Sequence, residues 1–236
     1  MNLHVYDDVR DLSDAAAYAF VEEAHKAIKE IGRFAVALAG GSTPKRTYEL
    51  LATRYGEEDL DWSKVHVFFG DERCVPPDHE DSNYRMAYKA LLSRVPVGSI
   101  HRIRGELSPH EAAVLYEEEL AAFFEGPPRL DLILLGVGED GHTASLFPRT
   151  PALEVTDRWV VENPVEKLGS MRLTLTVPAI SAARKVVFLV AGEGKARALR
   201  EILEGDADPR DYPAKLVRPA SGAVWMADQT AVRLLD

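Results

Sequence analysis

Residues 34–54 read FAVALAGGSTPKRTYELLATR and join an apolar run to a helix-forming run through two glycines. The run 34–39 is apolar at every position, which is typical of a strand buried on both faces of a parallel sheet. Pro44 stands in the first turn of the helix that follows, where its missing amide donor costs nothing. The stretch therefore predicts a buried strand, a tight turn and a helix.

The same arrangement recurs along the chain. Three more apolar runs occur at 65–69, 130–135 and 185–191. Helices are predicted at 11–30, 44–54, 83–94, 109–124 and 195–204. This alternation predicts an α/β protein with a mostly parallel central sheet and helices on both faces.

The remaining segments complete the predicted organisation. Leu and Thr alternate over 171–177, as in a strand that Pro178 ends, and 223–226 reads as a short strand before a C-terminal helix. The stretches 76–81 and 146–151 read as loops. No repeat or flexible linker interrupts the chain, so we expect one domain over residues 1–236.

Composition narrows the possible partners. The chain has 28 Lys and Arg against 38 Asp and Glu, a net charge of -10, and no basic stretch that could follow a nucleic-acid backbone. Local cations can still build a pocket for a small anion.

Cys74 is the only cysteine, so no disulfide framework is expected. With no leader-like start and no apolar run of about 18 residues, we expect a cytoplasmic protein without membrane contact, and favour a monomer.

The turn after the first apolar run is a candidate phosphate site. Gly41, Ser42 and Thr43 offer backbone amides and hydroxyls at the start of a helix, where the helix dipole favours an anion. The alternative is a tight turn in which a Ser or Thr only caps the helix.

Charged residues follow two further strands. Asp71 and Arg73 follow the run 65–69 after Gly70, where α/β sheets usually form their sites. Arg73 could bind phosphate, and Asp71 could act on a substrate hydroxyl or proton. The alternative is a surface turn with an internal ion pair. Arg172 and Lys195 supply two more cations near strand ends, with a surface salt bridge as the alternative for each.

The stretch 130–148, LDLILLGVGEDGHTASLFP, is a buried strand followed by a glycine-rich loop. Its glycines match the dinucleotide pattern G-x-G-x-x-G, but two carboxylates occupy the turn and Pro148 follows too soon for the long helix that the pattern needs. The loop is better suited to acid–base chemistry. His142 is the candidate general base, and Asp140 or Glu139 could orient its ring or hold substrate hydroxyls. The backbone at Gly138 could approach a ligand closely. Asp78, His79 and Asp81 match no defensible metal-ligand spacing.

These motifs resemble the 6-phosphogluconolactonases of the glucosamine-6-phosphate isomerase/6-phosphogluconolactonase family. The segments that carry the resemblance are AGGSTP at 39–44, FFGDERCVP at 68–76, DSNYRMA at 81–87, GVGEDGHTASLFP at 136–148 and the segment 187–199.

The resemblance implies a Rossmann-like, three-layer fold of the glucosamine-6-phosphate deaminase kind and hydrolysis of 6-phospho-D-glucono-1,5-lactone without a metal or organic cofactor. It implies that His142 is catalytic beside Asp140. It also implies a phosphate site formed by the following residues: Gly41, Ser42, Thr43, Arg73, Arg172 and Lys195.

Two alternatives differ in class from a lactonase. A glucosamine-6-phosphate deaminase would use an acid such as Asp71 as its base, but it usually carries a segment like GHIAFNEP, where this chain has GHTASLFP. A non-enzymatic sugar-phosphate sensor would normally add a helix-turn-helix, whereas the first 33 residues here read as one strand and one long helix.

Overall fold

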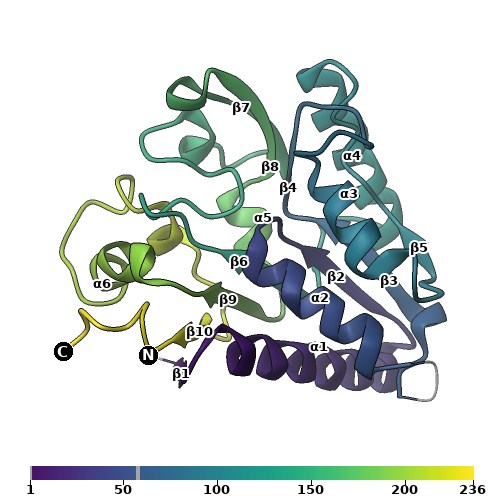
Figure 1. Cartoon of the computed structure of the whole chain (residues 1–236). Coiled ribbons are helices and arrows are strands. Elements are labelled where there is room, and N and C mark those ends of the chain that lie inside the picture. Colours follow the sequence, from purple (N-terminus) through teal and green to yellow (C-terminus); the bar gives the residue numbers. More distant parts are fainter. Residues whose placement is uncertain (1, 57–58) are drawn as a thin grey trace.

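The computed structural model describes residues 2–56 and 59–236, and its centre is a seven-stranded sheet (Figure 1). Every pair of neighbouring strands in this sheet is parallel. The strands, in their order across the sheet, are β1 (Asn2–Tyr6), β10 (Val224–Asp228), β9 (Val186–Val190), β6 (Leu132–Gly136), β2 (Phe34–Leu38), β3 (Val65–Phe69) and β5 (Ser99–Ile100). The predicted parallel sheet is confirmed, and all four predicted central strands belong to it.

Helices connect the strands. They are α1 (Val9–Ile31), α2 (Ser42–Arg54), α3 (Asn83–Ala87), α4 (Pro109–Phe124), α5 (Val177–Ser181) and α6 (Ala196–Leu203). Short 3-10 turns lie at Trp62–Lys64, Pro151–Glu154, Glu166–Leu168, Glu193–Lys195 and Pro213–Leu216. None of the helices among the described residues combines the length and the apolar character that crossing a membrane requires.

The helices form layers on the two faces of the sheet. Helices α1 and α2 pack against each other, α1 running beneath β10 and β2 in the view of Figure 1. Both lead the chain from one strand to the next in one direction across the sheet, whereas α4 and α6 lead it in the other. Because parallel crossovers are right-handed, α4 and α6 cover the opposite face.

Local sequence explains where α1 begins and ends. The Asp8 carboxylate accepts hydrogen bonds from the amides of Arg10 at 2.6 Å and Asp11 at 3.1 Å, which caps the first turn. Gly32 ends the helix with a φ of 77°, a conformation that glycine adopts without strain. The helix is thus slightly longer at both ends than the predicted 11–30.

A second, smaller sheet lies at the top of the molecule in Figure 1. Its antiparallel strands are β4 (Asp71–Arg73), β8 (Ser170–Leu175) and β7 (Val160–Val165), in the order β4-β8-β7. The predicted strand at 171–177 is therefore a strand, but it belongs to this sheet and ends two residues earlier.

Two predicted helices differ from the structure. Residues 83–94 form α3 followed by a π-helical turn, Tyr88–Leu92. The expected C-terminal helix after β10 is wrong, because residues 229–236 form turns. The Asp228 carboxylate accepts hydrogen bonds from the Thr230 hydroxyl and the Ala231 amide at 2.8 Å each. These local bonds hold the chain in a turn instead of a helix.

Two buried tyrosines anchor the carboxyl ends of the central strands. The Tyr48 hydroxyl, on α2, donates to the Ala39 carbonyl and accepts from the Ala39 amide, both at 2.9 Å. The Tyr116 hydroxyl, on α4, bonds the Phe69 amide and carbonyl in the same way, at 2.8 and 3.0 Å. Each tyrosine satisfies a backbone donor and acceptor where the sheet ladder stops. The turns that follow β2 and β3 are thereby held in place.

Candidate active site

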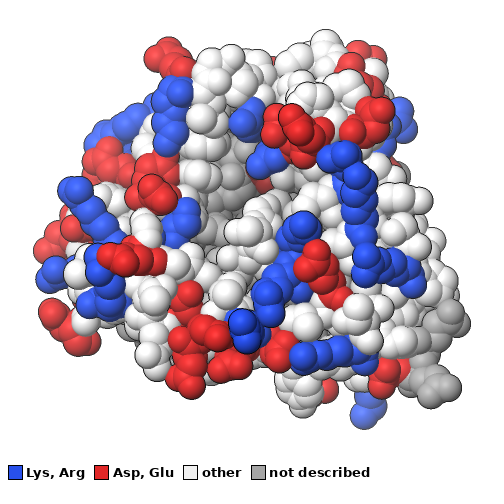
Figure 2. Space-filling model, in the orientation of Figure 1, with Lys and Arg blue, Asp and Glu red and all other residues white. Residues whose placement is uncertain are grey.

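The candidate site is a cavity of about 230 Å³ at the carboxyl ends of β2 and β6. These strands are neighbours, but the chain leaves β2 toward β3 and leaves β6 toward β9. Open parallel sheets bind their ligands at such a reversal of strand order. Figure 2 shows this face of the molecule hollowed near its middle, with Lys and Arg side chains beside the hollow.

A second cavity adjoins the first and shares several lining residues with it, so the two form one cleft. The cleft brings together every candidate residue from the sequence: Gly41, Ser42, Thr43, Asp71, Arg73, Gly138, Glu139, Asp140, His142, Arg172 and Lys195. These residues come from the loops after β2, β6 and β9, from the start of α2 and from the strands β4 and β8.

The loop after β2 places the N-terminus of α2 at the cavity wall. Gly41 is the N-cap residue with a φ of 101°, and no side chain caps the helix by a hydrogen bond. The alternative of a Ser or Thr cap is therefore wrong. Ser42 and Thr43, the first residues of α2, line the cavity instead, and the uncapped start of a helix suits an anion.

His142 is held by a carboxylate and an aromatic ring. Its Nδ1 lies 2.5 Å from Asp140 Oδ1, so we assign the Nδ1 proton to this bond and a lone pair to Nε2. The Phe147 ring stacks on the imidazole with 4.2 Å between centroids. A Cβ at Gly138 would lie 2.0 Å from His142 Nδ1, so only glycine leaves room for the ring.

The second oxygen of Asp140 accepts a hydrogen bond from Lys167 Nζ, and Lys167 also lies over the Phe147 ring. Burial on its own would raise the pKa of Asp140, but hydrogen bonds from His142 and Lys167 outweigh it and hold this pKa well below its ordinary value. Asp140 is thus a fixed negative charge beside the imidazole. Glu139 turns away from this pair toward the loop before α6, since a Cβ at Gly194 would lie 2.7 Å from its carboxylate.

Asp71 belongs to a buried polar network. Its side chain accepts hydrogen bonds from Asn83 Nδ2 at 3.0 Å and from the Ser145 hydroxyl at 2.6 Å, and the residue is only 7% exposed. The alternative of a surface turn with an Asp71–Arg73 ion pair is wrong, because both residues lie in β4 and the Arg73 guanidinium donates to the Asp81 carbonyl.

Three cationic residues line the cleft together with the His142–Asp140 pair. Arg73 and Arg172 stand directly opposite each other in the register of β4 and β8. The pKa of the Arg172 guanidinium is lowered below its ordinary value, mainly by burial and also by the positive charge of Arg73. Lys195 lines both cavities from the loop after β9. Like charges that line one cleft favour binding of an anion there.

Several site residues were not predicted from the sequence. Lys167 lies in no motif that the sequence singled out, while Ser145 and Phe147 appeared only inside the quoted segment 136–148 and Asn83 only inside 81–87. Asn83 directly follows Ser82, which caps α3 by accepting from the Arg85 amide, so a capping signal could have identified this position. In the described ranges 2–56 and 59–236, no group of three or more His, Cys, Asp and Glu could hold a metal ion.

The fold and the cleft define an α/β protein in which a histidine–carboxylate pair and three cationic side chains line one cleft, at the reversal of the strand order. The model of the family described as glucosamine-6-phosphate isomerases/6-phosphogluconolactonase matches residues 7–226. The chain belongs to this family.

Named relatives agree with this assignment. The chain is 50% identical over 213 residues to a 6-phosphogluconolactonase of Synechocystis sp., covering 87% of this chain and 86% of the relative. It is 39% identical over 203 residues to a 6-phosphogluconolactonase of Haemophilus influenzae, covering 85% and 87%. The structure of 6-phosphogluconolactonase from Trypanosoma brucei superposes with a TM-score of 0.88 at 30% identity, over 100% of this chain and 98% of that one.

Proposed function

We propose that this protein hydrolyses 6-phospho-D-glucono-1,5-lactone to 6-phospho-D-gluconate, the second step of the oxidative pentose phosphate pathway. Family membership and the names of the relatives support the substrate. The observation that carries the chemistry is the His142–Asp140 pair, which shares one cleft with Arg73, Arg172 and Lys195. A base and an anion site lie in one cleft, as a phosphorylated lactone requires.

His142 is the general base in this proposal. Its Nε2 takes a proton from water as the water oxygen attacks the lactone carbonyl carbon and the carbonyl π electrons move to oxygen. When the tetrahedral intermediate collapses, the bond from this carbon to the ring oxygen breaks and His142 returns the proton to that oxygen. Asp140 keeps the proton on Nδ1 and stabilises the imidazolium between the two steps.

The phosphate is bound in the same cleft as His142, by the cationic residues and the start of α2. Arg73, Arg172 and Lys195 supply the charge, and the N-terminus of α2 with Gly41, Ser42 and Thr43 supplies amides and hydroxyls. Binding at this remote group positions the carbonyl beside the base.

Three further residues are proposed as substrate contacts. Asp71 is fixed by Asn83 and Ser145 and accepts from a sugar hydroxyl. Gly138 lets the substrate approach the loop backbone, and Glu139 borders the cleft beside Lys195.

The chain is proposed to act as one lactonase domain over residues 1–236. In support, β1 near the N-terminus pairs with β10 near the C-terminus in the same sheet. The proposed chemistry needs water and a base and uses no metal or organic cofactor. The cytoplasmic location and the monomeric state stay predictions from the sequence.

The test is the rate of acid release from freshly generated 6-phosphogluconolactone, compared with its spontaneous hydrolysis. We expect rapid hydrolysis. A folded protein that leaves the spontaneous rate unchanged contradicts the proposal. Ammonia release from glucosamine 6-phosphate would then identify a deaminase, and sugar-phosphate binding without turnover of either compound would identify a sensor.

A further inference from the structure

Residues 205–217, the segment after α6, pack against both ends of the His142 loop, which we define as residues 138–149. Near the start of the loop, the Ala214 amide donates to the Gly141 carbonyl at 3.0 Å. At its end, the Arg149 amide donates to the Arg210 carbonyl at 3.0 Å. The segment therefore contacts the loop on either side of His142.

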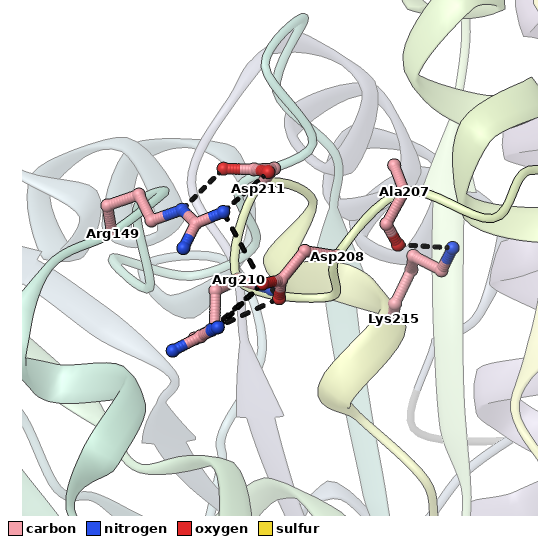
Figure 3. Close-up of polar contacts among 6 residues, drawn as sticks. All are labelled: Arg149, Ala207, Asp208, Arg210, Asp211 and Lys215. Carbon is pink, nitrogen blue, oxygen red and sulfur yellow. Dashed lines mark hydrogen bonds and ion pairs between the residues drawn. The ribbon is translucent and has the colours of Figure 1, made fainter.

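An ion-pair cluster reinforces the second contact (Figure 3). Arg149 donates from Nε and Nη2 to the two oxygens of Asp211 at 2.6 and 2.8 Å, and its Nη2 lies 3.4 Å from Asp208. Asp208 also accepts from Arg210 at 2.7 Å. The hydrogen bond from Arg149 lowers the pKa of Asp211, and those from Arg210 lower the pKa of Asp208, so both carboxylates stay ionised.

The loop backbone shows why such support is needed. Arg149 has a φ of 57°, in the left-handed region that non-glycine residues rarely adopt. Such a conformation persists only where the surroundings hold it. Two hydrogen bonds from the guanidinium to one carboxylate, together with the backbone bond to Arg210, hold this residue from both its side chain and its main chain.

Packing at the first contact is also close. Gly141 has a φ of 75°, and a Cβ there would lie 2.6 Å from Tyr212 Cδ1. Lys215 ties the two ends of the 205–217 segment together, because its Nζ donates to the carbonyls of Gly205 at 2.7 Å and Ala207 at 3.0 Å. These bonds make the segment a rigid surface on which the loop packs.

We propose that Arg149 is a positioning residue: through Asp211 and Asp208 it ties the 205–217 segment to the His142 loop and so fixes the imidazole at the distance and angle that proton transfer requires. The proposal rests on the lactonase function proposed above. Arg149 does not line the cleft, so its effect is on the placement of His142 and leaves phosphate binding unchanged.

The experiment compares kcat and KM for the lactone in Arg149→Ala, Arg149→Lys and Asp211→Asn. A small displacement of a catalytic group is costly, so we expect Arg149→Ala to lower kcat by about tenfold with KM within about twofold. Arg149→Lys keeps the charge but loses the paired bonds, so its kcat should be intermediate. Combining Arg149→Ala with Asp211→Asn should lower kcat no further than Arg149→Ala alone.

Arg54→Ala is the matched control. Arg54 pairs with Asp14 at 2.9 Å, and its side chain is 55% exposed against 52% for Arg149, but it lies at the far end of α2. It should leave kcat unchanged. A parental kcat in Arg149→Ala, or an equal loss in Arg54→Ala, overturns the proposal.

Amide hydrogen exchange tests the same placement without relying on turnover. In Arg149→Ala, residues 138–149 should exchange at least about tenfold faster while β2 and β3 keep their protection. If the parent protein does not hydrolyse the lactone, the proposed function fails, but faster exchange still supports the positioning role. Unchanged exchange of the loop overturns it.

Discussion

The two ring nitrogens of His142 have different surroundings, and this difference decides which of them can accept a proton from water. Nδ1 is bonded to Asp140, and the stacked Phe147 ring stops the imidazole from turning, so Nε2 is the nitrogen available to a water molecule. The sequence predicted His142 and offered Asp140 or Glu139 as its partner. Only the folded structure shows which of the two acids contacts His142, because both lie in a loop whose path depends on Gly138 and Gly141.

His142→Ala removes the proposed base and leaves the phosphate contacts in place. General base catalysis contributes roughly 100- to 10,000-fold, so we expect kcat to fall by about that factor with KM changed little. Steady-state kinetics on fresh lactone measures both constants. The control is His110→Ala, because His110 is a 73% exposed side chain on α4 away from the cleft. Parental turnover in His142→Ala would exclude the mechanism.

The lowered pKa of Asp140 makes a prediction about stability. Its folded-state pKa is below the ordinary value of about 3.9, so the carboxylate stabilises the fold above that pH and loses this effect as pH falls toward the folded-state pKa. We expect Asp140→Asn to lower the free energy of unfolding by about 1 kcal/mol at pH 7, the effect being discounted for partial exposure, and by less at pH 3.

Urea unfolding of both proteins at the two pH values measures this difference. The exposed Asp157→Asn serves as the control, with little difference expected at either pH. A cost for Asp140→Asn that is the same at pH 7 and pH 3 would show that the Asp140 charge has no part in it.

Among the elements, the short helix α3 depends on one buried carboxylate. Glu72 accepts from the amides of Arg73 at 2.8 Å, Asn83 at 2.7 Å and Tyr84 at 2.8 Å, and from the Ser82 hydroxyl at 3.0 Å. Glu72 is 2% exposed, and burial raises its pKa above the ordinary value even though the hydrogen bonds from these amides lower it. By fixing the start of α3, it places the Asn83 side chain against Asp71.

Glu72→Gln should therefore destabilise the protein. An amide has one acceptor oxygen, so two of the four donors would face its NH2 group, and we expect a loss of about 2–3 kcal/mol in the free energy of unfolding. Denaturant unfolding at neutral pH measures it. Glu22→Gln, on the exposed face of α1, should change it by less than about 0.5 kcal/mol. Equal stability of the two variants would contradict this role of Glu72.

The four central strands could be predicted because each is a continuous apolar run, which indicates a buried strand without reference to its neighbours. Two strands of the second sheet could not be predicted in this way. β4 has three residues and all are charged, while β7 contains Asn163 and Pro164, so neither resembles a strand in isolation. Both acquire their structure by pairing with β8, about 100 residues after β4 along the chain. Pairing at that separation also sets Arg73 opposite Arg172, which no local pattern indicates.

Over the whole molecule, the net charge of -10 and the cationic cleft act together. The acidic surface does not attract anions in general, so the proposed affinity for a sugar phosphate must come from the few cations inside the cleft. Arg73 and Arg172 repel each other when no anion is bound. In the proposed complex, the phosphate charge attracts both guanidinium groups and offsets their repulsion, so ligand binding should stabilise the entire fold.

This coupling predicts that 6-phosphogluconate, the proposed product, raises the Tm. A ligand at 100 times its Kd adds about 2.7 kcal/mol, and about 2–4 °C per kcal/mol applies to a chain of this length, so we expect a rise of about 5–10 °C. Gluconate, which lacks the phosphate, should raise the Tm far less. Arg172→Ala should lose most of the rise while its ligand-free Tm stays the same or increases, because the repulsion from Arg73 is gone. Equal shifts with gluconate and 6-phosphogluconate, or an undiminished shift in Arg172→Ala, would place the phosphate elsewhere.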